Sequence, residues 1–316
     1  MDVFREATLP PEWRGSVLAI GNFDGVHLGH RAMLSALVRN ARVANTRALV
    51  FTFDPHPLAF LRPDLVPPAL TTMSRRLELI AETGVDGVLV YPTDTALLEL
   101  TAEAFFDDII RGRLDARGLV EGPNFCFGKN RGGTIERLRE FCHRDSIGLD
   151  VVEPVELKTR MVSSTTVRQA ILEGDVDEAN RLLASRYQIE GTVVEGDRRG
   201  RTIGFPTANL SGIETVLPRD GVYSGRTRIG DEWWPTAMNV GPNPTFAEQR
   251  RKIEAHVIGY RGDLYGARLR FEFVARLRET RKFDGIESLK RQLEADIHRA
   301  IETVSADQRE IPVDVS

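Results

Sequence analysis

The sequence has little that would tie it to a membrane, to the cell exterior or to nucleic acid. Its two cysteines, Cys126 and Cys142, are too few for a disulfide framework and lack zinc-ligand spacing, so we expect reduced thiols in a cytoplasm. No run approaches the roughly 18 apolar residues of a membrane span. The N-terminus carries charges and prolines where a signal peptide would be apolar. The net charge of -4 supplies no basic field for nucleic acid or anionic lipid.

These absences favour a cytoplasmic protein whose ligands are small molecules. Neither nucleic acid nor a membrane is expected as a partner, and a homo-oligomer stays open. What the sequence does have is chain enough for two domains, since its 316 residues are about twice a usual domain length and 41% are hydrophobic.

The first half alternates short apolar runs with helical patterns, starting with a strand at 17–20 and a helix at 28–41. This pattern predicts a doubly wound, parallel-sheet α/β fold of the Rossmann-like kind, with ligands at the carboxyl ends of the strands. Further strands are predicted at 48–53, 87–91, 118–121 and 149–155, and helices at 74–82, 102–110, 134–142, 164–173 and 176–184. The stretch 54–68 contains five prolines, which predicts an irregular loop and a substrate lid.

The second half changes to short alternating runs separated by glycine, proline and aspartate. This pattern is typical of a small antiparallel β-barrel or a sandwich. Apolar residues then recur at helical spacing from Gly285 onward, which predicts a C-terminal helix. We expect domains at 1–184 and 185–305, followed by a polar tail at 306–316.

A glycine-rich turn, GNFDGVHLGH at 21–30, follows the first strand. Gly21, Gly25 and Gly29 let the backbone approach a ligand, and the helix that begins near Leu28 directs free N–H groups toward it. An anion is therefore expected here, with phosphate contacts from Gly21, Asn22, Phe23, Asp24 and Gly29.

Two histidines in this turn, His27 and His30, are three residues apart and so lie on one helical face. Both imidazoles could donate hydrogen bonds to polyphosphate oxygens. A metal site or a plain helix cap is the alternative, although no third metal ligand is evident and the helix dipole would repel a cation.

This turn resembles the H-x-G-H nucleotidyltransferase superfamily. FTFDPHP at 51–57, GPNFCFGKNRGG at 122–133 and VSSTTVR at 162–168 extend the resemblance to the FMN adenylyltransferase module of the bacterial bifunctional riboflavin kinase/FAD synthetases. The resemblance implies ATP and FMN as substrates and FAD as product. That family often has Asp where this chain has Asn124, so a polar contact is expected there without the charge.

The remaining motifs of the first half fit this chemistry. Ser164 and Thr165 are predicted at a helix cap with Arg168 one turn on, where hydroxyls, N–H groups and a guanidinium can converge on a triphosphate. Adenylyl transfer needs positioning and charge neutralisation by Mg²⁺, by His27 and His30 and by Arg168. Tentative flavin contacts, each with a core or turn role as its alternative, are Asn124, Phe125, Phe127, Asp54 and His56.

The second half carries a glycine-rich hairpin loop, GTVVEGDRRGRTIGFPTAN at 191–209. Gly196, Gly200 and Gly204, with Arg198, Arg199 and Arg201, suit a flap over phosphates, and a structural hairpin is the alternative. Thr207 and Asn209 are two apart on a predicted strand and offer two neutral oxygens to one hard cation. Glu254, in KIEAHVI at 252–258, is predicted to project into the barrel mouth as a general base, or to be a solvated charge.

The second half is similar to the flavokinase domain over about 120 residues. The resemblance rests on the glycine loop with PTAN, GVYSG at 221–225, NVGPNPTF at 239–246, and E-A-H ahead of GDLYG at 262–266. It implies that Thr207 and Asn209 hold the Mg²⁺ of ATP and that Glu254 deprotonates the terminal ribityl hydroxyl of riboflavin. His256 receives no role.

We therefore expect a bifunctional enzyme that phosphorylates riboflavin to FMN and adenylylates FMN to FAD. Two alternatives are a nucleotidyltransferase for another acceptor, such as a pantetheine or nicotinamide phosphate, and a flavin-sensing regulator that binds nucleic acid. The absence of a helix-turn-helix segment or a basic stripe speaks against the regulator.

Overall fold

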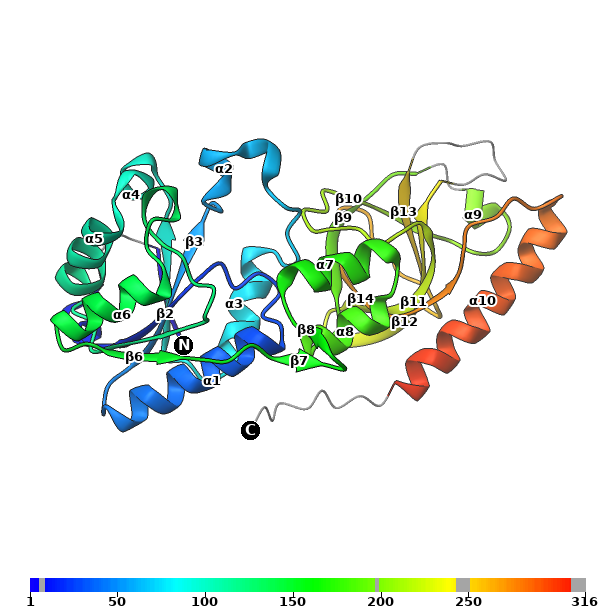
Figure 1. The fold of residues 1–316 in the computed structure, drawn as a ribbon. Coiled ribbons are helices and arrows are strands. Elements are labelled where there is room, and N and C mark those ends of the chain that lie inside the picture. The colour runs from blue at the N-terminus through cyan, green and yellow to red at the C-terminus, as the bar shows by residue number, and fades with distance from the viewer. Residues whose placement is uncertain (6–8, 197–198, 243–250, 308–316) are drawn as a thin grey trace. The chain divides into compact units, whose positions relative to one another are not determined.

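The computed structural model describes residues 1–5, 9–196, 199–242 and 251–307 (Figure 1). The chain divides into two compact units. The first comprises Met1–Pro67 and Met73–Val162, and the second comprises Pro68–Thr72 and the described chain from Ser163 onward. Arg198, the 243–246 part of the NVGPNPTF motif and the tail from 308 lie outside the described residues.

A six-stranded parallel sheet in the order β1-β4-β3-β2-β5-β6 forms the first unit, as predicted. The chain runs outward from central β2 to β3 and β4, then returns to β5 on the other side. The topological switch point, where ligands bind in such sheets, is therefore at the carboxyl ends of β2 and β5. The strands are β1 Asp2–Phe4, β2 Val17–Ile20, β3 Ala48–Asp54, β4 Gly87–Pro92, β5 Gly118–Glu121 and β6 Gly148–Val151.

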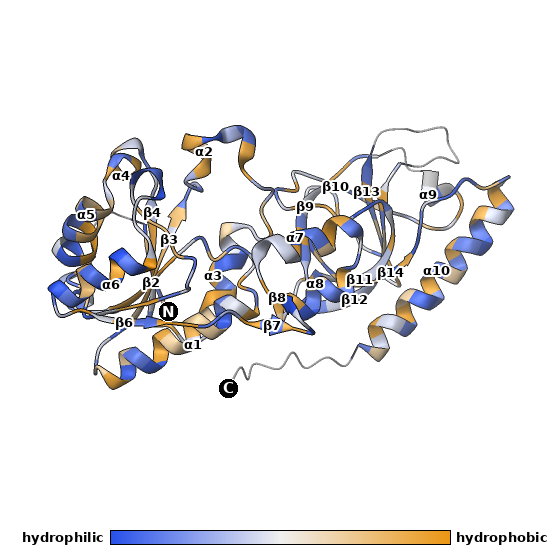
Figure 2. Ribbon diagram, in the orientation of Figure 1, coloured by the Kyte–Doolittle hydropathy of each residue, from blue (hydrophilic) through white to orange (hydrophobic). Residues whose placement is uncertain are grey.

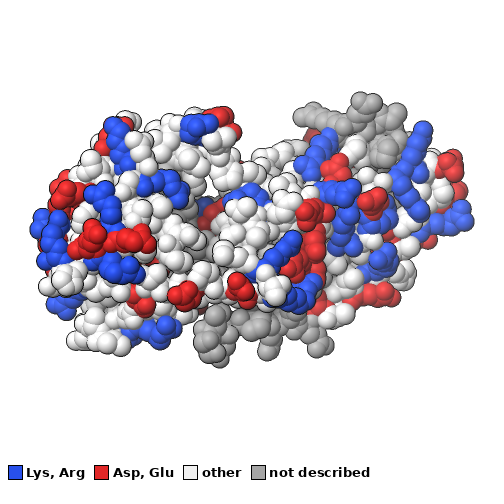
Figure 3. Space-filling model, viewed as in Figure 1, with Lys and Arg blue, Asp and Glu red and all other residues white. Residues whose placement is uncertain are grey.

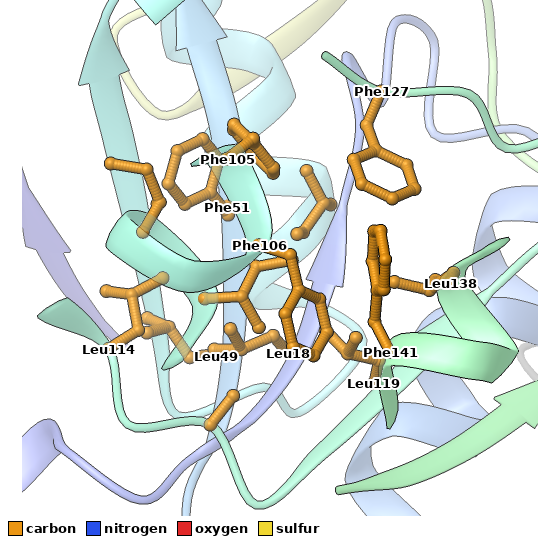
Figure 4. Close-up of a cluster of buried hydrophobic side chains, with 14 of the residues drawn as sticks. Leu18, Leu49, Phe51, Phe105, Phe106, Leu114, Leu119, Phe127, Leu138 and Phe141 are labelled. Atoms are coloured by element: carbon orange, nitrogen blue, oxygen red, sulfur yellow. The ribbon is translucent and has the colours of Figure 1, made fainter. Parts of the chain in front are cut away.

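Both faces of this sheet are buried, because successive residues of β2 enter different apolar clusters. Leu18 and Ile20 pack with the aromatic cluster shown in Figure 4, whereas Val17 and Ala19 pack against α1 and α3 residues on the opposite face. Figure 2 shows the corresponding hydrophobic colour along the strands. The helices are α1 Leu28–Val43, α2 Leu58–Leu61, α3 Met73–Ala81, α4 Thr95–Glu99, α5 Ala102–Ala104 and α6 Ile135–Arg144.

Shorter elements complete the first unit. A π-helix continues from α5, 3₁₀ turns occur in three connections, and β7 pairs with β8 as a short hairpin. They are the π-helix Phe105–Arg113, the turns Pro11–Trp13, Pro63–Leu65 and Lys129–Arg131, and the strands β7 Glu156–Leu157 and β8 Arg160–Met161. The expectation of no regular structure at 54–68 was therefore wrong in part, because α2 and the turn Pro63–Leu65 both form there. Helix α2 begins just after Pro57, and the turn begins at Pro63. Proline has a fixed φ that suits the start of a helical turn.

The second unit contains a closed antiparallel barrel in the order β10-β13-β12-β11-β14-β9, so the barrel alternative is confirmed over the sandwich. Alternate residues such as Tyr223, Met238 and Phe271 fill its interior. The expected C-terminal helix, α10 Ile286–Ala306, contacts β11, β12 and β14. The strands are β9 Gln188–Val194, β10 Ala208–Ser211, β11 Gly221–Ile229, β12 Glu232–Gly241, β13 Lys252–Val257 and β14 Arg268–Arg278.

Helices α7 Ser164–Glu173 and α8 Val176–Leu183 belong to the same compact unit as the barrel. Asn180 of α8 donates to the carbonyl of Phe273 and accepts from the N–H of Tyr187, so it ties this helix to β14 and to the chain entering β9. The domain boundary at 184/185 stays a prediction.

Lys and Arg are interspersed with Asp and Glu on the drawn face of each unit (Figure 3).

Candidate functional site

The glycine-rich turn lies at the carboxyl end of β2, next to the switch point. The turn is tight, because Phe23, Gly25 and Val26 all have positive φ values. His27 is the N-cap of α1, and its Nδ1 accepts a hydrogen bond from the N–H of His30 at 3.3 Å. The N–H groups of Leu28 and Gly29 donate to no other described residue. The start of α1 thus presents backbone donors of the kind that bind anions.

The two histidines expected to contact phosphate form a stacked pair, in which His27 is buried and His30 is half-buried. Their rings stack at 3.7 Å between centroids, and the ring of Phe23 lies 5.2 Å from that of His30. Burial lowers the pKa of His27 from 6.5 to about 4, against the attraction of Asp24. Burial, with the charges of His27 and Arg76, lowers the pKa of His30 well below its usual value. Both imidazoles are therefore neutral at pH 7, so each offers a ligand an N–H group rather than a positive charge.

A buried cation beside this pair, Arg76 of α3, was missed from the sequence. Its Nη2 lies 3.4 Å from a carboxylate oxygen of Asp24, and the two side chains are 10% and 11% exposed. Burial lowers the pKa of Arg76, while Asp24 and Asp54 raise it. The available signal was an arginine on the apolar side of the 74–82 helix, where a charge needs a reason to be buried.

Three side-chain atoms near this turn are buried and have no hydrogen-bond partner among the described residues: Asn22 Oδ1, His30 Nδ1 and Arg76 Nε. Unsatisfied buried polar atoms are rare, and each one demands an explanation. Donors and acceptors gathered at a helix N-terminus and at the sheet's switch point would be satisfied by a bound polar ligand. The site therefore has the chemistry to hold a polar ligand that both donates and accepts hydrogen bonds.

The chain after β3 reaches the same turn. The side-chain amide of Asn22 lies 3.0 Å from Nε2 of His56, and Nδ1 of His56 accepts from the N–H of Leu58. Asp54 is exposed at the end of β3. The structure thus brings His56 to the glycine-rich turn.

A buried carboxyl at the switch point, Glu121, was also missed. It is 1% exposed at the end of β5, and its Oε1 accepts from the N–H of Ile20 at 2.8 Å. Burial raises its pKa well above 4.5, against this hydrogen bond, which lowers it. The side chain takes the place of a backbone partner for β2 just before the glycine-rich turn.

The expected flavin contacts are placed differently from one another. Asn124 is exposed on the turn after β5, and Phe125 is half-buried. Phe127 is 6% exposed and lies in the apolar cluster of Figure 4, with its ring 5.9 Å from Phe105 and 5.4 Å from Phe125. Phe127 therefore has a core role, whereas Asn124 and Phe125 are open to a ligand.

The SSTTVR motif begins one residue after the first unit ends. The carbonyl oxygen of Val162 lies 3.5 Å from where a Cβ on Gly29 would stand. Ser163, rather than Ser164, caps α7 in a capping box with Thr166, so Ser164 and Thr165 are its first two residues. Nε of Arg168 donates to the carbonyl of Pro68 at 2.8 Å, within the second unit.

A second polar site lies on the barrel. Asn209 of β10 is directly opposite Glu254 of β13, so the two side chains share one face. This face is the outer one, because Ile253, Ala255 and Val257 of the same strand are buried toward the interior. Glu254 is thus half-buried on the barrel wall and does not point into its core. Thr207 is exposed one residue before β10 begins.

Gly196 of the glycine loop lies directly against Asn209 on this face. A Cβ on Gly196 would stand 2.1 Å from Nδ2 of Asn209, and one on Gly200 would stand 2.3 Å from the carbonyl oxygen of Phe205. Gly204 has φ +93° and open space around it. These close approaches explain the glycines at 196 and 200, which no larger residue could replace without movement.

His256, left without a role by the sequence, holds the segment before Thr207. Its Nδ1 lies 2.7 Å from the carbonyl oxygen of Pro206, which can only accept, so Nδ1 carries the proton. The ring also packs edge-on to Phe205.

The residues present fit Mg²⁺, because the Thr207 hydroxyl and Asn209 amide are hard oxygen donors and Mg²⁺ keeps water and phosphate as its other ligands. Among the described residues there is no group of three or more His, Cys, Asp or Glu suited to a metal.

No helix in the described parts of the chain has the length and apolar character required to cross a membrane.

Two family models match the sequence: FAD synthetase over residues 9–166 and riboflavin kinase over residues 183–304. Two similar proteins are named bifunctional riboflavin kinase/FMN adenylyltransferase. The one from Pseudomonas fluorescens is 36% identical and aligns over 92% of this chain and 94% of its own. The one from Escherichia coli K12 is 36% identical over 89% and 90%.

A solved structure described as a macrolide-efflux protein from Streptococcus pneumoniae is also similar. It has a TM-score of 0.84 and 31% sequence identity, and the match covers 95% of this chain and 98% of that one. Similarity at this level extends over both units of the chain.

Proposed function

The chain belongs to the family of bifunctional riboflavin kinase/FMN adenylyltransferases, and we propose that its two sites divide the two reactions between them. The enzyme phosphorylates riboflavin with ATP to FMN and adenylylates FMN with a second ATP to FAD and pyrophosphate. We assign the adenylyl transfer to the glycine-rich turn of the first unit and the phosphoryl transfer to the outer face of the barrel.

For adenylyl transfer, the phosphate of FMN attacks the α-phosphorus of ATP and pyrophosphate leaves, so no side-chain nucleophile is required. The neutral His27 and His30 donate N–H hydrogen bonds to the triphosphate, and the N-terminus of α1 supplies further donors. Arg76 adds the nearby positive charge that the neutral imidazoles do not. From the α7 segment we propose Ser164, Thr165 and Arg168 as further phosphate contacts.

For FMN itself we propose contacts on the loops that follow β3 and β5. Asn22 holds His56 beside the glycine-rich turn. On the turn after β5, Asn124 is exposed and Phe125 is half-buried. A half-buried ring and an exposed amide suit an isoalloxazine, which has both a π-face and polar edges. Asp54 remains a proposed contact at the end of β3.

For phosphoryl transfer, Glu254 removes the proton of the terminal ribityl hydroxyl, whose oxygen then attacks the γ-phosphorus of ATP. The observation that carries this assignment is the direct pairing of Glu254 with Asn209 on one barrel face. Thr207 and Asn209 would hold Mg²⁺, which neutralises phosphate charge when bound. Gly196, Gly200 and Gly204 let the loop close over the phosphates.

The test separates the two sites within the full-length protein. Glu254→Ala or Asn209→Ala should abolish formation of FMN from riboflavin, while FAD still forms from supplied FMN. His30→Ala should do the reverse. Products are separated by chromatography with Mg²⁺ and ATP present, and loss of both reactions in any one folded variant would contradict separate sites. Omission of Mg²⁺ should stop both reactions.

We also propose that the enzyme acts in the cytoplasm, where its substrates riboflavin and ATP are available to a protein with reduced thiols. Both cysteines are free thiols, and burial raises the pKa of Cys142 to about 11. Recovery of the activity in the membrane or periplasmic fraction of lysed cells would contradict this placement.

A further inference from the structure

A polar row crosses three neighbouring strands of the barrel face that carries Glu254. Asn209 on β10 and Asn239 on β12 each lie directly opposite Glu254 on β13. Residues so paired across antiparallel strands have Cβ atoms about 4.5–5.5 Å apart on the same face. The carboxylate of Glu254 is therefore flanked by two amides. Asn209 is the proposed Mg²⁺ contact, and Asn239 has not yet been given a role.

Asn239 carries a donor without an acceptor. Its Nδ2 is buried and forms no hydrogen bond to any residue in the described parts of the chain. On its far side the next residue of the row is Val222, which packs into an apolar cluster with Leu277 and Ala300. The side chain of Val222 offers no acceptor to this donor, whereas a hydroxyl placed beside Glu254 would satisfy it.

We propose that Asn239 and Glu254 together hold the hydroxyl that receives the phosphoryl group, which makes Asn239 a specificity-determining residue of the kinase site. This inference rests on the proposed role of Glu254. A hydroxyl has one O–H donor and two acceptor lone pairs. It can therefore donate to the Glu254 carboxylate and accept from Asn239 Nδ2 at the same time.

The reaction then proceeds with one lone pair of the hydroxyl free. Glu254 takes the proton, the hydroxyl oxygen forms a bond to the γ-phosphorus of ATP, and the bond from that phosphorus to the bridging oxygen breaks, so ADP leaves with the electron pair. Asn239 orients the oxygen throughout. A flavin without the terminal hydroxyl leaves the buried Nδ2 unpaired, and a site built to pair a hydroxyl rejects such an analogue for that reason.

The test compares riboflavin with 5′-deoxyriboflavin, which lacks only this hydroxyl. Binding of each to the full-length protein is measured by flavin fluorescence in the presence of ADP and Mg²⁺. Wild type should bind riboflavin more tightly than 5′-deoxyriboflavin. In Asn239→Ala the ratio of the two affinities should fall about tenfold, the size of one hydrogen bond, because riboflavin binds more weakly while 5′-deoxyriboflavin binds as before. Asn239→Asp keeps the shape but removes the donor, so it should lose at least as much.

Asn239→Ser supplies a second test with a smaller donor and should keep part of the preference. FAD formation from supplied FMN and the urea midpoint report whether each variant is folded. The inference is overturned if Asn239→Ala weakens both flavins equally or leaves the preference unchanged. If wild type fails to phosphorylate riboflavin, the proposed function fails instead, so the two failures are distinguishable.

Discussion

The loop glycine at 196 allows the sharpest test of how the kinase site is assembled. A Cβ at this position would stand 2.1 Å from Nδ2, 2.6 Å from Cγ and 3.0 Å from Oδ1 of Asn209. Ordinary contacts of a Cβ begin at 3.4 Å. In Gly196→Ala, either the loop or the Asn209 amide must therefore move by about 1 Å, a displacement that can lower a reaction rate on the order of 100-fold.

We expect Gly196→Ala to lower the kcat for riboflavin phosphorylation by about 100-fold and to raise the Mg²⁺ concentration needed for half-maximal rate, because Asn209 is the proposed Mg²⁺ contact. Adenylylation of supplied FMN should not change, since none of the residues proposed for it lies in the glycine loop around Gly196. Chromatographic product assays at several Mg²⁺ concentrations measure both effects.

Gly285→Ala is the matched control in the same unit, because a Cβ there meets no atom within 4 Å. It should leave both reactions at the wild-type rate. If folded Gly196→Ala phosphorylates riboflavin within about twofold of wild type at every Mg²⁺ concentration, the position of the Asn209 amide does not matter and the reasoning is refuted.

Three further predictions concern the first unit. Arg76→Met leaves Asp24 buried without its cation and should destabilise the protein by about 3–5 kcal/mol in urea unfolding, with part of this loss restored by adding Asp24→Asn. The folded-state pKa of Glu121 is raised above 4.5, so its contribution to stability is present below that pH and is lost as pH rises through the folded value. Glu121→Gln keeps the acceptor for Ile20 and should remove this loss from a Tm series, whereas parallel curves would contradict it. The pKa of His27 is lowered from 6.5 to about 4, so its contribution is present above pH 6.5 and is lost as pH falls toward 4; a less steep acid loss is expected in His27→Gln, measured by urea unfolding.

Much of the fold could be predicted because hydrophobic periodicity is local. The run 17–20 is apolar at every position, as a strand buried on both faces must be, and the helix expected from residue 28 forms as Leu28–Val43. The proline-rich loop was misread, since prolines can also begin short helical turns, as before α2. The strand β1 Asp2–Phe4 was missed because three residues carry too little pattern and are recruited by pairing with β4.

The candidate site was predictable where a motif keeps its residues close in the chain. His27 and His30 are one turn apart, so their stacking follows from helical spacing. Arg76 and Glu121 were not found, because each is defined by a partner far along the chain: Asp24 for Arg76 and the N–H of Ile20 for Glu121. From the sequence alone, a charged residue is expected at the protein surface, because such residues are rarely buried.

The sequence by itself determined the two motif sets, and with them the family and both reactions, since backbone turns, helix caps and alternate strand positions depend on neighbours in the chain. Only the tertiary structure decided which side chains face one another across strands. The register of β10, β13 and β12 places Asn209 and Asn239 on either side of Glu254, although 15 to 45 residues separate these three positions in the chain. Pairing between strands is set by barrel closure and interior packing, which no local pattern encodes.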